Sequence, residues 1–144
     1  HGVPVMLLVP HAMMHHIDAV AARYPGLRLV LDHLGVPSSV PVAERFTKLD
    51  ELLKLARHPN VAVKASALPV LAVDDYPYRS LHVHLRRVCD AFGSWLVFWG
   101  IDLSRLRGTY LQAVTQITEE MSWLSEDDKH WIMGRGVCEW LGWT

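Results

Sequence analysis

Two segments of the chain place ionisable side chains directly after short apolar runs. Residues 95–101 lead into Asp102, and residues 27–31 lead into Asp32 and His33. Apolar runs of this length, rich in Val, Leu and aromatic residues, predict buried strands. The end of a strand is a rigid position next to a variable loop, where catalytic groups are often found. A carboxylate and an imidazole on one rim can exchange protons with water, so we expect Asp102 and His33 to be catalytic.

Apolar runs alternate with stretches of helical periodicity along the chain. We expect strands at residues 4–9, 27–32, 61–66 and 96–100, and helical stripes near residues 17–24, 46–56 and 81–92. The tail carries two further helices, the last with Ser125 as its N-cap. Because helical crossovers join parallel strands, we expect one parallel sheet in sequential order with helices packed outside.

This pattern favours half of a (β/α)₈ barrel over a dinucleotide-binding sheet. Residues 10–12, Pro-His-Ala, stand where a glycine-rich phosphate loop would follow the first strand. The loops that follow the second and third strands are longer than those that precede the strands, which is typical of barrels. The predicted fold is therefore α/β, a partial barrel with extra C-terminal helices and a single domain over residues 1–144.

Four stretches occur in order along the chain: PVMLLVP at residues 4–10, YPGLRLVLDHLG at 24–35, HPNVAVKASA at 58–67 and FWGIDLSRL at 98–106. Together with the ending at residues 124–143, they closely resemble the second half of amidohydrolase-related, metal-dependent hydrolases. These proteins are (β/α)₈ barrels that hydrolyse or decarboxylate small carboxylated molecules, including sugar and pyrone lactones. The resemblance implies that this chain supplies strands five to eight.

The resemblance also bears on metal binding. The family's first strand carries a His-x-His pair, and no segment here matches that strand. The sequence His82-Val83-His84 has the right spelling but opens a helix, where residues two apart face different ways, so we expect it to be solvated or packed against a loop. A divalent metal such as zinc is implied for a complete barrel, with His33 and Asp102 among its ligands. In this chain alone we expect none, because two ligands fall short of three.

The remaining candidates surround the predicted rim. The resemblance gives Asp102 the role of general base or metal contact, and gives His33 that of metal ligand or partner of a substrate oxyanion. Strand alternation predicts that Asp32 points away from His33 and is a structural acceptor. A further cluster of His11, His15 and His16 favours an exposed helix face over a metal site.

Four polar residues are candidates for substrate binding. Lys64 and Ser66 share one strand face, which in a barrel is the lumen, and Lys64 either binds a substrate carboxylate or pairs with Asp102. Arg79 and Arg105 could each clamp a carboxylate through the planar guanidinium, and the alternative is that they are surface charges.

Composition excludes several classes of protein. The chain is 51% hydrophobic with a net charge of −1, which gives no electrostatic reason to expect nucleic acid or an acidic membrane as a partner. The two cysteines have no paired spacing, which argues against a disulfide framework. The longest apolar runs fall short of the roughly 18 residues of a membrane span, and the opening residues lack a basic leader. We therefore expect a cytoplasmic protein.

Three hypotheses for function follow. The first is a hydrolase of a small carboxylated lactone, ester or related C–O or C–N bond, acting by water activation at the barrel rim. The second is one piece of a split or longer amidohydrolase, and the third is a non-catalytic remnant or binding module. Because a half barrel exposes two strand edges and its lumen, we expect a homodimer or a complex with the missing N-terminal half.

Overall fold

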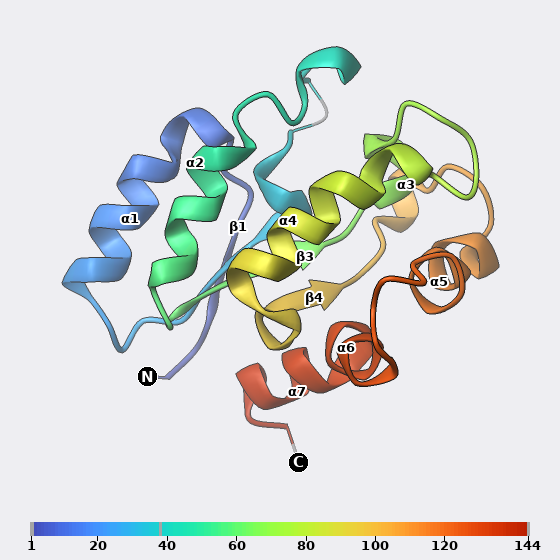
Figure 1. Cartoon of the computed structure of the whole chain (residues 1–144). Helices are drawn as coiled ribbons and strands as arrows, with labels where there is room; N and C mark the ends of the chain where they lie inside the picture. The colour runs from blue at the N-terminus through green and yellow to red at the C-terminus, as the bar shows by residue number, and fades with distance from the viewer. Residues whose placement is uncertain (1, 38, 144) are drawn as a thin grey trace.

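The structure is a computed structural model that describes residues 2–37 and 39–143. Its centre is a four-stranded sheet of β1 (Val5–Leu7), β2 (Leu29–Leu31), β3 (Val61–Ala65) and β4 (Val97–Trp99). All three neighbouring pairs are parallel, and the order β1-β2-β3-β4 follows the chain (Figure 1). The predicted parallel sheet in sequential order is confirmed.

The strands are shorter than the sequence predicts. β1 has three residues where residues 4–9 were expected, and β2 ends at Leu31 because Asp32 already begins a 3-10 turn. β3 ends at Ala65 and β4 at Trp99, each one residue before the expected end. Apolar composition marks which residues are buried, but the sheet ends where the backbone stops pairing. The residues just beyond these ends therefore belong to loops.

Helices connect the strands and extend the tail. They are α1 (Met14–Arg23), α2 (Leu49–Leu53), α3 (Leu68–Leu71), α4 (His82–Phe92), α5 (Tyr110–Thr118), α6 (Glu126–His130) and α7 (Gly136–Leu141). The expected N-cap at Ser125 is confirmed, since its hydroxyl accepts from the Asp128 backbone and the Asp128 carboxylate accepts from the Ser125 backbone. Within the described residues, no helix combines the length and apolar character needed to cross a lipid bilayer.

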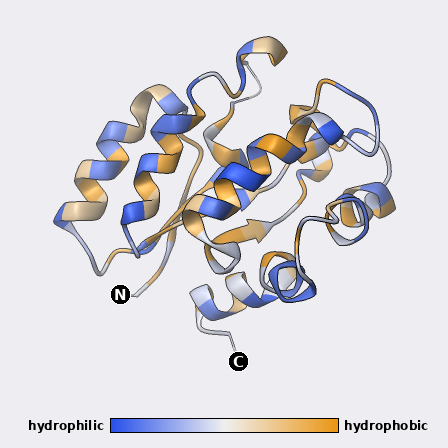
Figure 2. Ribbon diagram, viewed as in Figure 1, coloured by the Kyte–Doolittle hydropathy of each residue, from blue (hydrophilic) through white to orange (hydrophobic). Residues whose placement is uncertain are grey.

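The two faces of the sheet bury different sets of side chains. Leu29, Leu31, Val61 and Val63 belong to the main core, which lies beneath α1, α2 and α4 on one face. Figure 2 shows these helices with both polar and apolar turns over largely apolar strands. The alternate strand residues Val30, Ala62 and Phe98 form a second cluster, against which Val137 and Trp140 of α7 pack. A parallel sheet needs cover on both faces, and here the tail supplies part of the second cover.

A single amide joins the loops at the amino-terminal edge of the sheet. The Asn60 side chain is buried, and its Nδ2 group donates to the carbonyls of Ala21, Tyr24 and Leu27 at 3.2, 3.2 and 2.9 Å. These carbonyls belong to the end of α1 and the turn before β2. The sequence marks residues 58–60 only as a helix stop, whereas the structure shows that Asn60 also holds α1 to β2.

We predict that Asn60→Ala lowers the free energy of unfolding by roughly 1–3 kcal/mol, because it leaves buried carbonyls without their donor. Chemical denaturation followed by circular dichroism measures the change. His16→Ala on the exposed face of α1 is the control and should stay within about 0.5 kcal/mol. An Asn60→Ala chain as stable as the control would contradict this role.

Candidate active site

The site begins with an unusual turn after β2. His33 and Leu34 have φ values of 53° and 54°, and Gly35 follows with 67°. Non-glycine residues rarely adopt left-handed backbone, and such strain is concentrated at functional sites. Glycine fits position 35 because the backbone there is left-handed and a Cβ would lie 2.4 Å from Met14 Cε and 3.0 Å from the Val9 carbonyl oxygen. The turn brings the His33 ring back over the carboxyl end of β3.

Ser66 holds the His33 ring in place. The Ser66 Oγ lies 2.8 Å from His33 Nδ1 and accepts from the His33 backbone N–H at 3.3 Å. After accepting that backbone bond, the Ser66 hydroxyl still has its donor and a second acceptor site, so it can bond Nδ1 in either His33 tautomer. In the tautomer in which Ser66 donates to Nδ1, a neutral His33 carries its proton on Nε2, the nitrogen that lies nearest Asp102.

His33 Nε2 and Asp102 Oδ2 are 3.9 Å apart, with both side chains about one-fifth exposed. This separation is too long for a direct hydrogen bond. It suits an oxygen atom, from water or from a substrate, that bonds to both groups at about 2.8 Å each. The expectation that His33 and Asp102 lie at the same end of the sheet, within reach of one small ligand, is confirmed.

The Asp102 carboxylate has two further neighbours. Ser104 Oγ donates to Asp102 Oδ1 at 2.6 Å, and Arg105 Nε lies 3.7 Å from Oδ2. The Ser104 hydroxyl, and then the charge of Arg105, hold the pKa of the Asp102 carboxyl below its ordinary value, against an opposing effect of burial. Asp102 is therefore ionised at neutral pH. The sequence analysis missed Ser104, although a serine two residues after an acid is a frequent local partner.

Lys64 pairs with Asp32, and not with Asp102 as one alternative had it. Its Nζ lies 2.8 Å from Asp32 Oδ1. This contact is an ion pair without hydrogen-bond angles, since that buried oxygen has no hydrogen-bond partner in the described structure. Two opposite charges this close attract at any angle, so Lys64 and Asp32 form an ion pair. The Asp32 carboxylate therefore balances the charge of Lys64, which is consistent with the structural role expected for Asp32.

The expectation that Asp32 and His33 point to opposite faces is wrong. Asp32 reaches Lys64, and His33 reaches Ser66, two residues further along the same face of the sheet. Strand alternation ends at Leu31, and the left-handed conformation of His33 turns its side chain to the side that Asp32 occupies. Gly100 lies beside the same side chains, since a Cβ on it would lie 3.4 Å from Ser66 Cβ and 3.7 Å from Lys64 Cε.

The other candidates lie elsewhere. Arg79 starts a turn before α4 with an exposed side chain, and no described hydrogen bond or ion pair joins it to the His33 and Asp102 pair. His84 stacks on Phe46 with ring centroids 4.1 Å apart, so the second of the His-x-His residues packs against the loop before α2.

The histidines near α1 divide into two environments. His15 and His16 are exposed, as expected. His11 is buried, which corrects its expected exposure, and its Nε2 lies 2.8 Å from the Leu34 carbonyl. It is buried because it lies in the turn before α1, beneath the strained turn that follows β2.

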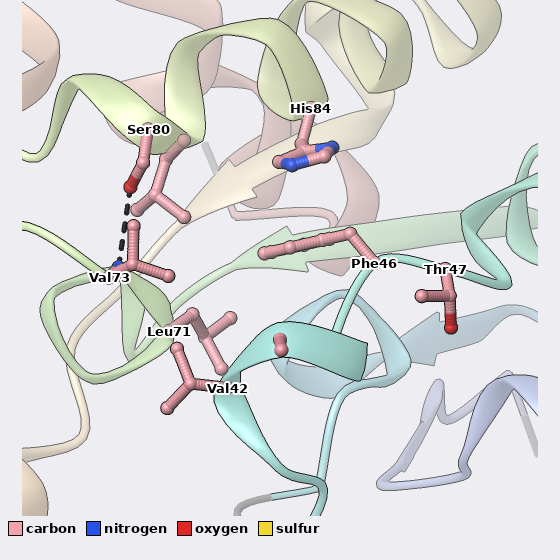
Figure 3. A pocket seen from close by; sticks show the side chains of 9 residues that line it. Val42, Phe46, Thr47, Leu71, Val73, Ser80 and His84 are labelled. Atoms are coloured by element: carbon pink, nitrogen blue, oxygen red, sulfur yellow. Dashed lines mark hydrogen bonds between the residues drawn. The ribbon is translucent and has the colours of Figure 1, made fainter.

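A largely apolar pocket lies outside this group of residues. Figure 3 shows Val42 and Phe46 from the loop after β2 facing Leu71 and Val73 from the segment after β3, with His84 of α4 above. Its volume is about 320 Å³. None of the predicted site residues lines it, so the candidate active site is the polar group at the strand ends.

The donor set available to a metal is small. Within residues 2–37 and 39–143, no group of three His, Cys, Asp or Glu side chains is arranged to hold an ion. His33 and Asp102 supply two donors, and a catalytic zinc site normally has three protein ligands.

A sequence profile of the amidohydrolases matches residues 1–135. The chain belongs to the amidohydrolase family. An L-fucono-1,5-lactonase from Burkholderia ambifaria is 38% identical over 114 residues, which cover 76% of this chain and 38% of the relative. This amidohydrolase chain thus spans well under half the length of that curated relative.

Solved structures share the fold. A zinc-bound amidohydrolase from Burkholderia multivorans aligns with a TM-score of 0.81 at 23% identity, covering 96% of this chain and 52% of the other. A 5-carboxyvanillate decarboxylase from Sphingomonas paucimobilis aligns with a TM-score of 0.57 at 21% identity, covering 93% of this chain and 38% of the other. One fold therefore carries different reactions, and the chemistry has to be argued from the site.

We predict that Ser104→Ala raises the pKa of the Asp102 carboxyl toward its ordinary value. The lowered pKa stabilises the folded chain above the ordinary pKa of aspartate, and this contribution disappears as pH falls through the folded value. Ser104→Ala should therefore destabilise the chain at neutral pH more than at strongly acidic pH. Carboxyl ¹³C NMR titration checks the pKa, and Ser122→Ala, at another exposed serine, should leave it unchanged.

Proposed function

We propose that this chain provides the catalytic rim of a hydrolase that opens a lactone, or a related ester, of a small carboxylated molecule with an activated water. The observation that carries the proposal is the 3.9 Å gap between His33 Nε2 and Asp102 Oδ2, at the carboxyl end of the sheet. The likeness to an L-fucono-1,5-lactonase supports a lactone as the substrate class.

The proposed reaction needs one proton acceptor and one hydrogen-bond donor. A water molecule bound to Asp102 attacks the carbonyl carbon and gives its proton to the carboxylate as the new C–O bond forms. His33 Nε2–H donates to the oxygen that gains negative charge. The ring C–O bond then breaks, and the departing oxygen takes the proton from Asp102. The product is a hydroxy acid, and the carboxylate is regenerated.

The neighbouring residues take supporting roles in this proposal. Ser66 is a positioning residue, because its hydroxyl fixes the His33 ring and tautomer rather than facing substrate. Arg105 is the best placed of the substrate-binding candidates, since its guanidinium is about one-third exposed beside Asp102. The charge of Lys64 is already balanced by Asp32. Arg79, in the turn before α4, would contact only a larger substrate, or would need that turn to move toward Asp102.

His33 and Asp102 would supply two of the ligands that a divalent ion such as zinc needs, and the others would have to come from outside this chain. A bound ion would supply Lewis acidity toward the carbonyl and acidity to water. With an ion bound through Nε2, His33 would no longer donate to the carbonyl oxygen, and Asp102 would share its carboxylate between the ion and the water.

We also propose that the four strands are strands five to eight of a (β/α)₈ barrel, completed by another protein segment. Solved relatives of this fold are about twice as long as the aligned part. The edge strand β1 leaves Val5, Met6 and the following Leu8 between 38% and 52% exposed, which is unusual for apolar strand residues. Either an N-terminal half or a second copy of this chain would cover them.

We predict that Asp102→Asn lowers kcat/KM for hydrolysis of L-fucono-1,5-lactone by roughly 10²–10⁴-fold, because the amide cannot accept the water proton. Proton release measured with a pH indicator follows the reaction. Asp90→Asn, at an exposed carboxylate on α4, should keep full activity. An Asp102→Asn protein as active as the parent would refute the role of Asp102. A parent chain with no lactone-opening activity in any assembled form would favour the non-catalytic alternative.

The assembly proposal has its own test. Light scattering on the purified 144-residue chain should show a dimer, or a complex when an N-terminal half is supplied, because open strand edges and apolar side chains would otherwise meet water. A stable, folded monomer that binds no hydrophobic dye would exclude both partners.

A further inference from the structure

A second cavity, with charged residues in a largely apolar wall, lies at the same edge of the sheet as the catalytic pair. It has a volume of about 200 Å³. It is bounded by residues 10–12 after β1, residues 35–37 and 40 after β2, and residues 44, 45, 47 and 48 before α2. None of these is a member of the His33 and Asp102 group. The cavity is therefore separate from the proposed active site.

Arg45 is the unusual group in its wall. The side chain is only 9% exposed, and it bridges two loops by donating from Nε to the Val40 carbonyl at 3.3 Å and from Nη1 to the Val70 carbonyl. In the part of the chain that the structure describes, no carboxylate pairs with this guanidinium, and Nη2 has no hydrogen-bond partner. Nη2 is not among the buried unpaired atoms, so this edge of the guanidinium reaches solvent and is open to an anion from outside.

The other charges of the cavity leave a positive balance. Lys48 adds a second cation and Glu44 one anion, both on exposed residues. His11 in the wall is neutral at physiological pH, because burial lowers the pKa of its imidazole. With Arg45 counted, the walls carry one net positive charge.

We propose that this cavity binds a small monocarboxylate, whose carboxylate accepts from the open edge of the Arg45 guanidinium with Lys48 nearby. A single negative charge matches the net charge of the walls, whereas a dianion such as phosphate would exceed it. Val36, Pro37 and Val40 give the cavity an apolar side that suits a short carbon chain. The volume of about 200 Å³ corresponds to about seven water molecules, at roughly 30 Å³ each, and a four-carbon acid fits within it.

The test is a titration of the isotope-labelled 144-residue chain with sodium butanoate at constant ionic strength, followed by NMR. We expect saturable shifts at the Arg45 Nε–H and at the backbone amides of Gly35 and Lys48. Butanamide, which has the same shape without charge, should produce no saturable shift, and phosphate should bind more weakly than butanoate.

Variants separate a binding site from a structural arginine. Lys48→Gln removes an exposed charge without touching the buried contacts and should weaken butanoate binding about two- to fivefold. Lys54→Gln, at an exposed lysine paired with Glu51, is the matched control and should bind as the parent does. Equal responses to butanoate, butanamide and phosphate, shifts confined to the Asp102 region, or unchanged binding in Lys48→Gln would each overturn the proposal.

Discussion

The structure depends on one constraint, which is that a parallel sheet has to be covered on both faces. The first face is covered by α1, α2 and α4. The second face changes character along the strands. In the middle of the strands, α7 packs against Val30, Ala62 and Phe98. Two residues later along each strand direction, the same face carries Asp32, Lys64 and Gly100. The apolar part of this face packs against α7, and the polar part carries the candidate site. Packing of the C-terminal helix therefore stabilises the strands that position the site residues.

The strained turn after β2 is the second determinant of the site. A regular continuation of β2 would have pointed His33 into the core that Leu29 and Leu31 occupy. Three successive residues with positive φ reverse the ring instead, and the Ser66 hydroxyl holds it there through two contacts. Burial of Leu34 and the tight approach of Met14 to Gly35 stabilise a conformation that His33 and Leu34 would not adopt alone.

The sequence predicts the fold better than it predicts the contacts within the site. Alternating apolar runs and helical stripes were sufficient for the four parallel strands and their order, and for the proximity of His33 and Asp102. The pairing of Lys64 with Asp32 depends on the register of β2 against β3, which the sequence pattern does not give. The position of the His33 ring and the burial of His11 beneath Leu34 were not predictable, because they depend on the left-handed backbone at His33 and Leu34. Neither residue type signals that conformation. The short helix α3 was missed for a related reason, since it begins after Ala67, which is also left-handed.

Charge balance around Asp102 links stability to the proposed reaction. Ser104 and Arg105 keep the carboxylate ionised, which stabilises the folded rim but also makes Asp102 a weaker base. The Arg105 contact is long, at 3.7 Å, and partly exposed, so Arg105 is free to turn toward an anionic substrate. For a lactone that carries a further, free carboxylate, an arginine that leaves Asp102 for that group would raise the basicity of Asp102 when the substrate is present. The resting site would then keep a stable, weakly basic carboxylate, and binding of such a substrate would itself supply the stronger base.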